Sequence, residues 1–245
     1  MEKIVSLKTN DGKKLRCITN ISSKENKSVV VFIHGLTGHP NEHTFYNAAQ
    51  TFPKKGVDVF RPALYWWDDG NRMLHECGLK THSEDLNRVL RYLKPKYEHI
   101  HLVGHSCGSP TILGSNFKAA STITLWDPSY LKNGIKKHLK EVSVGKKQYW
   151  LSEDQIGYLL SKRFVDEWEW FDGVNELEIV KNIEVPLHVI TAGKGGLKGA
   201  KSYSEISAGP AKYTEIKGAT HCFDEAGAEK ELLKETLAWI KKYSK

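Results

Sequence analysis

The segment Leu102-Val103-Gly104-His105-Ser106-Cys107-Gly108 decides the fold class. It lies at the end of an apolar run that predicts a buried strand, and it precedes residues 111–117, which are compatible with a helix. The G-x-S-x-G spacing is typical of a sharp turn from strand to helix, because glycines on both sides leave room for a serine with a strained backbone. The pattern therefore predicts that the Ser106 hydroxyl stands clear of a sheet, as a nucleophile must.

Around this turn, the chain alternates between strand and helix patterns. Residues 4–7 and 15–18 flank Asn10-Asp11-Gly12 and predict an antiparallel hairpin. The continuous apolar run at 29–33 predicts a strand that is buried on both faces, as in a parallel sheet. Further strands are expected at residues 57–60, 100–103, 121–125, 187–190 and 213–216.

One helix is predicted directly by its spacing. Its apolar residues recur at the period of a half-buried helix, at Leu86, Val89, Leu90 and Leu93. The preceding Thr81-x-x-Glu84 pattern predicts a capping box at the start of this helix.

A long connection breaks the alternation. Roughly sixty residues separate the strand at 121–125 from the strand at 187–190, and a connection of that length needs structure of its own. Ser152-x-x-Gln155, followed by apolar residues, predicts a capped helix there. The expected architecture is a doubly wound α/β core of residues 1–127 and 185–245, with a helical cap insertion over residues 128–184 between the sixth and seventh core strands.

Composition limits the location of the protein. The chain contains no run of eighteen apolar residues and no basic-then-apolar leader, so we expect neither a membrane span nor a secretory signal. Its four cysteines, Cys17, Cys77, Cys107 and Cys222, form no C-x-x-C pair. Free thiols suit a reducing compartment, and a cytoplasmic location is therefore expected.

Part of the net charge of +7 is concentrated between residues 131 and 147, where six lysines face a single acid, Glu141. A solvated helix face and an anion-attracting rim near a binding site both fit this pattern. A nucleic-acid or partner-binding module would be supported only by this charge, because the segment has no basic motif interleaved with aromatic residues. No nucleic-acid partner is therefore expected.

The chain resembles the α/β-hydrolase superfamily, and within it the serine esterases and lipases that carry a helical cap. The resemblance covers nearly the whole chain and rests on the turn at Ser106, the His34-Gly35 loop, the long insertion, and His221, which follows the last predicted strand. It implies that Ser106 is the nucleophile and His221 the general base. It also implies that the backbone N–H groups of Leu36 and Cys107 form the oxyanion hole.

The acid of the implied triad departs from the commonest family pattern. In that pattern an aspartate follows the strand expected here at 187–190, but the next residues, 191–200, contain four glycines, two lysines and no acid. These residues do not fit a phosphate-binding loop either. A family variant carries the acid one strand earlier, where Asp127 stands, and Asp127 is the expected acid. Glu205, Asp172 and a Ser–His dyad without a carboxylate remain alternatives.

Three neighbouring patterns offer other chemistry. His105 is a rival base, but we expect its side chain to point away from Ser106 and pack beside the strand. Cys107 is adjacent to the site, but its implied role is through the backbone and not as a thiol nucleophile. Residues 39–43 match H-x-x-E-H, a zinc-protease signature, but they include Pro40 and lack an evident third ligand, so no metal site is expected.

The implied reaction is hydrolysis of a carboxylic ester through an acyl-enzyme, and it needs no cofactor. A small-molecule ester or acyl compound is the expected partner. Aromatic residues proposed to line its pocket are Trp66, Trp67, Trp150 and Tyr158. A thioesterase or acyltransferase of the same fold, and a non-catalytic ligand-binding protein on this scaffold, remain open, and the sequence gives no oligomeric state.

Overall fold

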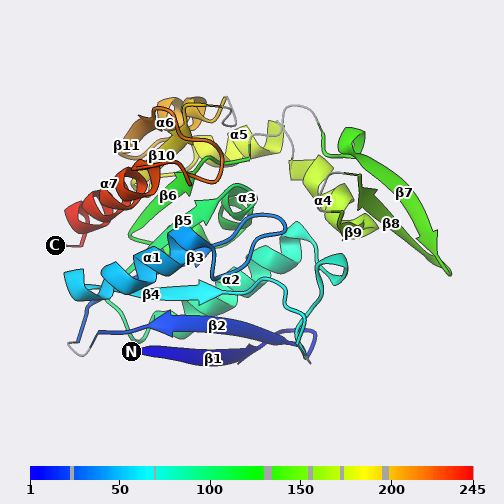
Figure 1. Ribbon diagram of the computed structural model, residues 1–245, viewed down its shortest axis with the longest axis horizontal. Helices are drawn as coiled ribbons and strands as arrows, with labels where there is room; N and C mark the ends of the chain where they lie inside the picture. The colour runs from blue at the N-terminus through cyan, green and yellow to red at the C-terminus, as the bar shows by residue number, and fades with distance from the viewer. Residues whose placement is uncertain are drawn as a thin grey trace.

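A computed structural model describes residues 1–22, 25–68, 70–129, 134–153, 157–171, 174–194 and 199–244. In these residues, one sheet of eight strands forms the centre of the molecule, in the order β1-β2-β4-β3-β5-β6-β10-β11 (Figure 1). The strands are β1 (Glu2–Lys8), β2 (Lys14–Asn20), β3 (Ser28–Ile33), β4 (Val57–Pro62), β5 (His99–His105), β6 (Thr122–Trp126), β10 (Leu187–Ala192) and β11 (Ala211–Ile216). The strands from β4 to β11 in this order are parallel, whereas β1 and β2 pair antiparallel.

The strand predictions are confirmed because the pattern of burial matches the apolar runs. All six residues of β3 and of β10 are buried, as expected for strands covered on both faces. The predicted hairpin is formed by β1 and β2, with Gly12 at a φ of 80° in the turn between them. The parallel strands bring their carboxyl ends to one edge of the sheet, where sites form in folds of this type.

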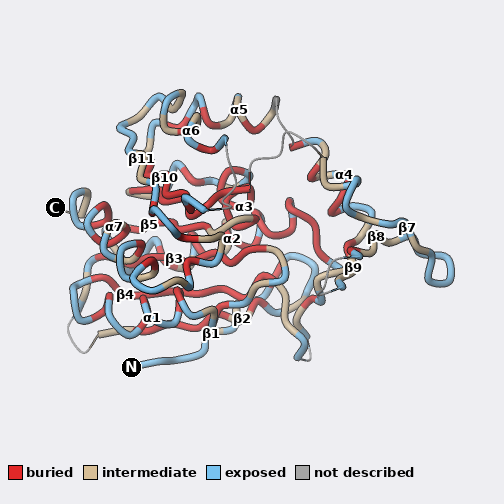
Figure 2. Tube along the Cα trace, turned by 45° about the horizontal axis from the view of Figure 1, so that its top comes forward, coloured by how far each residue is buried: buried red, intermediate tan, exposed pale blue. Residues whose placement is uncertain are grey.

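Helices cover both faces of the sheet, and the strands between them are the most buried part of the chain (Figure 2). Residues of α1 and α7 pack with Phe32 and Trp126 on one face, and residues of α2 and α3 pack with Val31 and Leu102 on the other. The doubly wound α/β prediction is therefore confirmed. The helices are α1 (His43–Thr51), α2 (Leu79–Leu93), α3 (Gly108–Leu113), α4 (Lys162–Phe171), α5 (Val174–Lys181), α6 (Lys201–Ile206) and α7 (Ala228–Lys242). Short 3₁₀ turns lie at Pro53–Lys55, Leu74–Glu76, Phe117–Ala119 and Lys136–His138. In the part of the chain that the structure describes, none of the helices has the length and apolar character needed to cross a membrane.

The insertion between β6 and β10 contains the expected helices and also strands, which the sequence patterns did not predict. Three antiparallel strands, β7 (Leu139–Val144), β8 (Lys147–Ser152) and β9 (Leu159–Ser161), precede α4 and α5. Gly145, at a φ of 61°, allows the tight turn between β7 and β8, and the aromatic residues of β8 suit a strand. Apolar residues at 159 and 160 thus extend a sheet and not a helix, and residues 154–156 lie outside the described residues.

The same strands explain the lysine-rich segment. Its prediction as a helix face is also wrong, because residues 139–144 and 147–152 pair as a hairpin, while Lys132 lies outside the described residues. Lys140, Lys146 and Lys147 are exposed along this hairpin, which projects from the body of the molecule (Figure 1).

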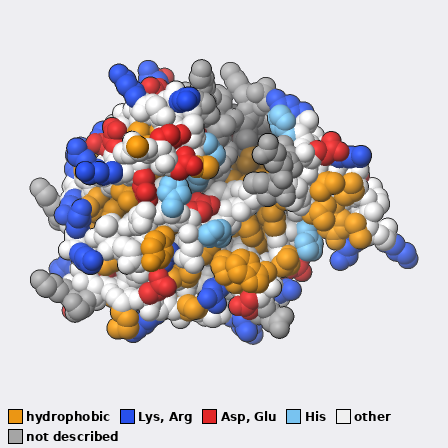
Figure 3. Space-filling model, viewed as in Figure 1, with side chains coloured by type: hydrophobic (Ala, Val, Ile, Leu, Met, Phe, Trp, Pro, Cys, Tyr) orange, Lys and Arg blue, Asp and Glu red, His pale blue; other side chains and the backbone are white. Residues whose placement is uncertain are grey.

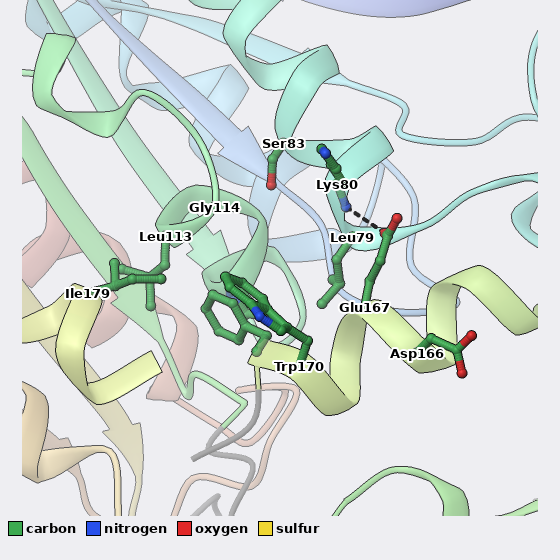
Figure 4. Close-up of a pocket in the computed structure, with 11 residues that line it drawn as sticks. Leu79, Lys80, Ser83, Leu113, Gly114, Asp166, Glu167, Trp170 and Ile179 are labelled. Carbon is green, nitrogen blue, oxygen red and sulfur yellow. Dashed lines mark hydrogen bonds between the residues drawn. The ribbon is translucent and has the colours of Figure 1, made fainter. Parts of the chain in front are cut away.

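The start of α2 is capped by the insertion and not by its own sequence. The helix begins at Leu79, so the predicted capping box at Thr81 lies inside it and is wrong. The N–H of Lys80 donates instead to Glu167 Oε2 of α4 at 2.9 Å, the dashed contact in Figure 4. Arg163 of α4 also donates to Thr81 Oγ1. These contacts attach the insertion to the core.

His82 lies at this junction as a buried neutral side chain. It is 1% exposed, with ring centroids 6.0 Å from Tyr65 and 5.8 Å from Phe164 of α4. Among the described residues, neither of its ring nitrogens has a hydrogen-bond partner. Burial, aided by the nearby His34 and two arginines, lowers the pKa of His82 to about 3.

Replacement of His82 by phenylalanine should make the fold less sensitive to acid. In the unfolded chain, His82 binds a proton below a pH of about 6.5. In the folded chain, it stays neutral until the pH falls to about 3. This residue should therefore remove about 1.4 kcal/mol of the free energy of unfolding for each pH unit of that window. Urea unfolding between pH 4 and pH 7 measures the slope, and parallel curves for the wild type and His82→Phe would contradict the assignment. His101 and His188, whose pKa values burial also lowers to about 3, contribute equally in both proteins.

Candidate active site

The turn after β5 holds Ser106 in a conformation that few non-glycine residues adopt. Its φ is 51°, and its N–H donates to the carbonyl of Trp126 at 3.0 Å. A Cβ at Gly104 would lie 2.7 Å from the carbonyl oxygen of Gly108, and a Cβ at Gly108 would overlap the carbonyl oxygen of Ile33. Both glycines of the motif are therefore required by close backbone packing, as the sequence pattern predicted.

Asp127 and His221 meet across the carboxyl edge of the sheet. Asp127 directly follows β6, is fully buried, and lies with Oδ2 2.5 Å from His221 Nδ1. Its other oxygen, Oδ1, accepts the N–H of Ala192 at the end of β10, at 3.1 Å. Because a carboxylate only accepts, this arrangement places a proton on His221 Nδ1 and leaves Nε2 free to act as a base.

The glycine-rich stretch after β10 supports this pair through its backbone. Besides the N–H of Ala192, the N–H of Lys194 donates to the carbonyl of Ala219, two residues before His221, at 2.8 Å. Residues 195–198 lie outside the described residues, as does the alternative acid Asp172. The other alternative, Glu205, lies on α6 in an exposed ion pair with Lys201.

Ser106 and His221 line one cavity of about 460 Å³. Among the described residues, Ser106 Oγ makes no hydrogen bond to His221, and it lies 3.4 Å from Ser129 Oγ. Contacts between a nucleophile and its base are often long in unliganded sites. Histidine and carboxylate side chains gather near the centre of this face of the molecule (Figure 3).

The loop after β3 lies directly against the serine. A Cβ at Gly35 would be 3.2 Å from Ser106 Cβ. The carbonyl of Gly35 accepts the Tyr65 hydroxyl at 3.1 Å, and His34 Nε2 accepts the N–H of Leu64 at 3.0 Å. These contacts fix the backbone that leads into Leu36, which lines the cavity.

Cys107 has the properties of a buried packing residue. It is 3% exposed, and burial raises the pKa of its thiol, so the thiol stays protonated. A buried, protonated thiol is a poor nucleophile.

His105 differs from its predicted place beside the strand. Its ring contributes to the wall of the cavity, with the centroid 4.8 Å from that of His221, and its Nε2 contacts the carbonyl of His221 at 2.9 Å. The sequence motif fixes the backbone of this residue but does not show which way the ring turns.

The four aromatic residues expected around the substrate do not line the cavity that holds Ser106. Trp66 and Trp67 stack on each other with centroids 3.8 Å apart, and Trp67 is 73% exposed. Trp150 lies on β8 beneath Lys136, and Tyr158 packs against the core next to β9. Their role in substrate binding remains a proposal.

Figure 4 shows a second cavity, of about 560 Å³. It is formed where α4 and α5 meet α2 and α3, and Trp170, Leu113 and Ile179 are among its walls. None of Ser106, Asp127 and His221 is among its described lining residues. The smaller cavity is therefore the candidate active site.

Sequence reasoning missed several residues of this site. Ser129 donates its N–H to the carbonyl of Ser106 at 3.2 Å, and Glu42 and His43 line the cavity. Ser129 could have been found, because it follows Asp127 by two residues at the same sheet edge. Glu42 and His43 belong to the H-x-x-E-H pattern, which is considered above only as a metal signature.

Replacement of Gly108 by alanine should destabilise the turn. The added methyl group would overlap the carbonyl oxygen of Ile33, and overpacking of this kind costs about 1–3 kcal/mol. Denaturant unfolding of Gly108→Ala measures the loss. An unchanged free energy of unfolding would show that the turn is less tightly packed than described.

Comparisons with known proteins agree with this fold. A family model described as an alpha/beta hydrolase of unknown function (DUF900) matches residues 9–116. Est1E from Butyrivibrio proteoclasticus, solved with ferulic acid bound, is 17% identical with a TM-score of 0.79, and the match covers 98% of each chain. The esterase domain of a Rhodothermus marinus protein is also 17% identical, with a TM-score of 0.76 over the full length of both chains.

A dienelactone hydrolase from Anabaena variabilis is 12% identical, with a TM-score of 0.71 over 100% of this chain and 99% of the other. Among curated proteins, no significant sequence match is found. The family model and the full-length structural matches support the superfamily resemblance that the motifs predicted, and the protein has the α/β-hydrolase fold.

Proposed function

We propose that this protein is a serine hydrolase that cleaves a carboxylic ester through an acyl-enzyme. The observation that carries the proposal is that a strained serine and an Asp127–His221 pair converge on one cavity. A binding protein has no need of a buried carboxylate that pairs with an imidazole in the same cavity as a strained serine. Similarity to an esterase domain and to other hydrolases supports the same reaction class.

In the proposed mechanism, His221 Nε2 takes the proton of Ser106 as Oγ attacks the ester carbonyl carbon. The carbonyl oxygen becomes an anion that faces the N–H groups of Leu36 and Cys107. Collapse of this intermediate breaks the bond to the alcohol, which receives the proton from His221. Water then attacks the acyl carbon and gives its proton to His221. The bond to Ser106 Oγ breaks, the carboxylic acid is released, and Oγ recovers the proton from His221. Asp127 stabilises the imidazolium in both steps.

This chemistry requires no cofactor, and the substrate is proposed to be a small-molecule ester. The insertion, over residues 128–184, is proposed to act as a cap on a core of residues 1–127 and 185–245. It leaves the core directly after Asp127, so it begins at the sheet edge that carries the site. Trp66, Trp67, Trp150 and Tyr158 are proposed to contact the acyl or alcohol group when the cap and core enclose it. The four cysteines are unpaired, which supports the proposed cytoplasmic location.

A fluorophosphonate probe should label the folded protein once, at Ser106. Intact mass and peptide mapping measure the label, and Ser106→Ala should remain unmodified, while Ser129→Ala should still react. Absence of labelling in the wild type, with a small probe that enters the cavity, would favour a non-catalytic ligand-binding protein. Comparison of turnover with an ester, a thioester and an added alcohol acceptor separates a hydrolase from a thioesterase or acyltransferase.

Asp127→Asn should reduce kcat by about 10³- to 10⁴-fold. The asparagine oxygen is expected to keep the N–H of Ala192, so its NH₂ group faces His221 Nδ1 and forces the proton onto Nε2. The base is then protonated at the wrong nitrogen. Glu205→Gln is the matched control, because Glu205 lies in an exposed ion pair, and it should retain kcat. Equal losses in the two variants would exclude Asp127 as the specific acid.

A further inference from the structure

Two consecutive carbonyl groups in the loop that carries His221 are each bound by a histidine. The carbonyl of His221 contacts His105 Nε2 at 2.9 Å, and the carbonyl of Cys222 contacts His43 Nε2 at 3.1 Å. His105 is the last residue of β5 and directly precedes Ser106, whereas His43 begins α1. Since a carbonyl oxygen only accepts, each Nε2 carries the proton of its contact.

Each of these histidines has a glutamate at its other nitrogen. Glu42 Oε2 lies 3.8 Å from His105 Nδ1, and Glu229 Oε2 lies 3.6 Å from His43 Nδ1. Glu42 and His43 are neighbours in the chain, so one short segment serves both contacts. Two glutamate–histidine pairs therefore hold two adjacent peptide units of the same loop.

Glu42 is itself fixed as a carboxylate. Its Oε1 accepts the N–H of His39 at 3.2 Å. Burial alone would raise the pKa of Glu42, but the interaction with His105, with His34 nearby, holds that pKa below its usual value. Of the last two residues of the H-x-x-E-H pattern, His43 thus contacts the loop that carries His221, and Glu42 faces His105.

The loop has a reason to need external support. Phe223 adopts a φ of 56°, a conformation that a bulky side chain rarely adopts, and its ring is buried. Strained turns of this kind persist only where surrounding contacts over-determine them. The His221 side chain is 37% exposed, so its own packing restrains the imidazole only in part.

We propose that Glu42–His105 and Glu229–His43 are positioning pairs that hold the peptide units of residues 221 and 222, and thereby keep the His221 ring aligned between Asp127 and Ser106. The inference rests on the proposed function, because the alignment matters only if His221 is a base. Neither histidine exchanges a proton with the substrate.

The first test separates the donor group from the bulk of the ring. His105→Phe removes both nitrogens, whereas His105→Gln keeps an N–H that can reach the carbonyl of His221. We expect His105→Phe to lower kcat by about 10- to 100-fold with KM nearly unchanged, since a small displacement of a catalytic group costs this much. His105→Gln should recover most of the lost kcat. His99→Phe, at the opposite end of β5, is the matched control and should keep the wild-type kcat.

The second test asks whether the residues act as pairs. Glu42→Gln keeps an acceptor for the N–H of His39 but removes the charge that faces His105. Its effect on kcat should disappear in the His105→Phe background, since the glutamate acts through the histidine. His43→Phe and Glu229→Gln should show the same relation. If the losses of kcat from the two single substitutions multiply in either the Glu42–His105 or the Glu229–His43 double variant, the pairing is overturned.

The third test is independent of activity. Amide hydrogen exchange of residues 218–223 should be faster in His105→Phe and His43→Phe than in the wild type and His99→Phe. If the wild type neither hydrolyses esters nor reacts with a fluorophosphonate, the proposed function fails, and with it the role in catalysis. Two outcomes with an active wild type would refute only the positioning pairs. One is unchanged hydrogen exchange and kcat in both His105→Phe and His43→Phe. The other is a folded His105→Gln that loses as much kcat as His105→Phe.

Discussion

The 2.5 Å contact between Asp127 Oδ2 and His221 Nδ1 is the interaction on which the rest of the site depends. It joins the end of β6 to the loop after β11, and β10 lies between these two strands. The contact is possible because parallel strands deliver their following loops to one edge of the sheet. The N–H of Ala192 from β10 also donates to the carboxylate, so residues from three adjacent strands meet at this contact. A displacement of any of them would change the direction in which His221 Nε2 points.

The serine is held by a different constraint, which is close packing of backbone. Gly104 and Gly108 allow β5, α3 and the end of β3 to approach without side chains between them. The strain at Ser106 is therefore maintained by the core of the domain and not by the loop alone. Rigid elements thus hold the serine, whereas a loop with a strained Phe223 carries His221. This asymmetry explains why additional contacts gather around His221.

Much of the fold could be predicted from the sequence because its strands are buried on both faces and appear as continuous apolar runs. Ser106 and Asp127 could be located because each directly follows a buried strand at the carboxyl edge, and His221 because it lies in the loop after the last strand. The strands of the insertion could not, since short apolar segments fit a helix or a strand equally well and cross-strand pairing decides between them. The residue that caps the N-terminus of α2 could not be predicted either, because Glu167 lies 87 residues from Lys80 in the chain. The contacts of His105 and His43 involve backbone carbonyls, which leave no pattern in the side chains.

The most direct measurement is a crystal structure of the protein after reaction with a small phosphonate. We expect phosphorus bonded to Ser106 Oγ, its negatively charged oxygen within about 2.7–3.1 Å of the N–H groups of Leu36 and Cys107, and His221 between Asp127 and the adduct. An adduct on another residue, or a His221 ring that has left Asp127 in the reacted protein, would contradict the assignment of these three side chains to one catalytic unit.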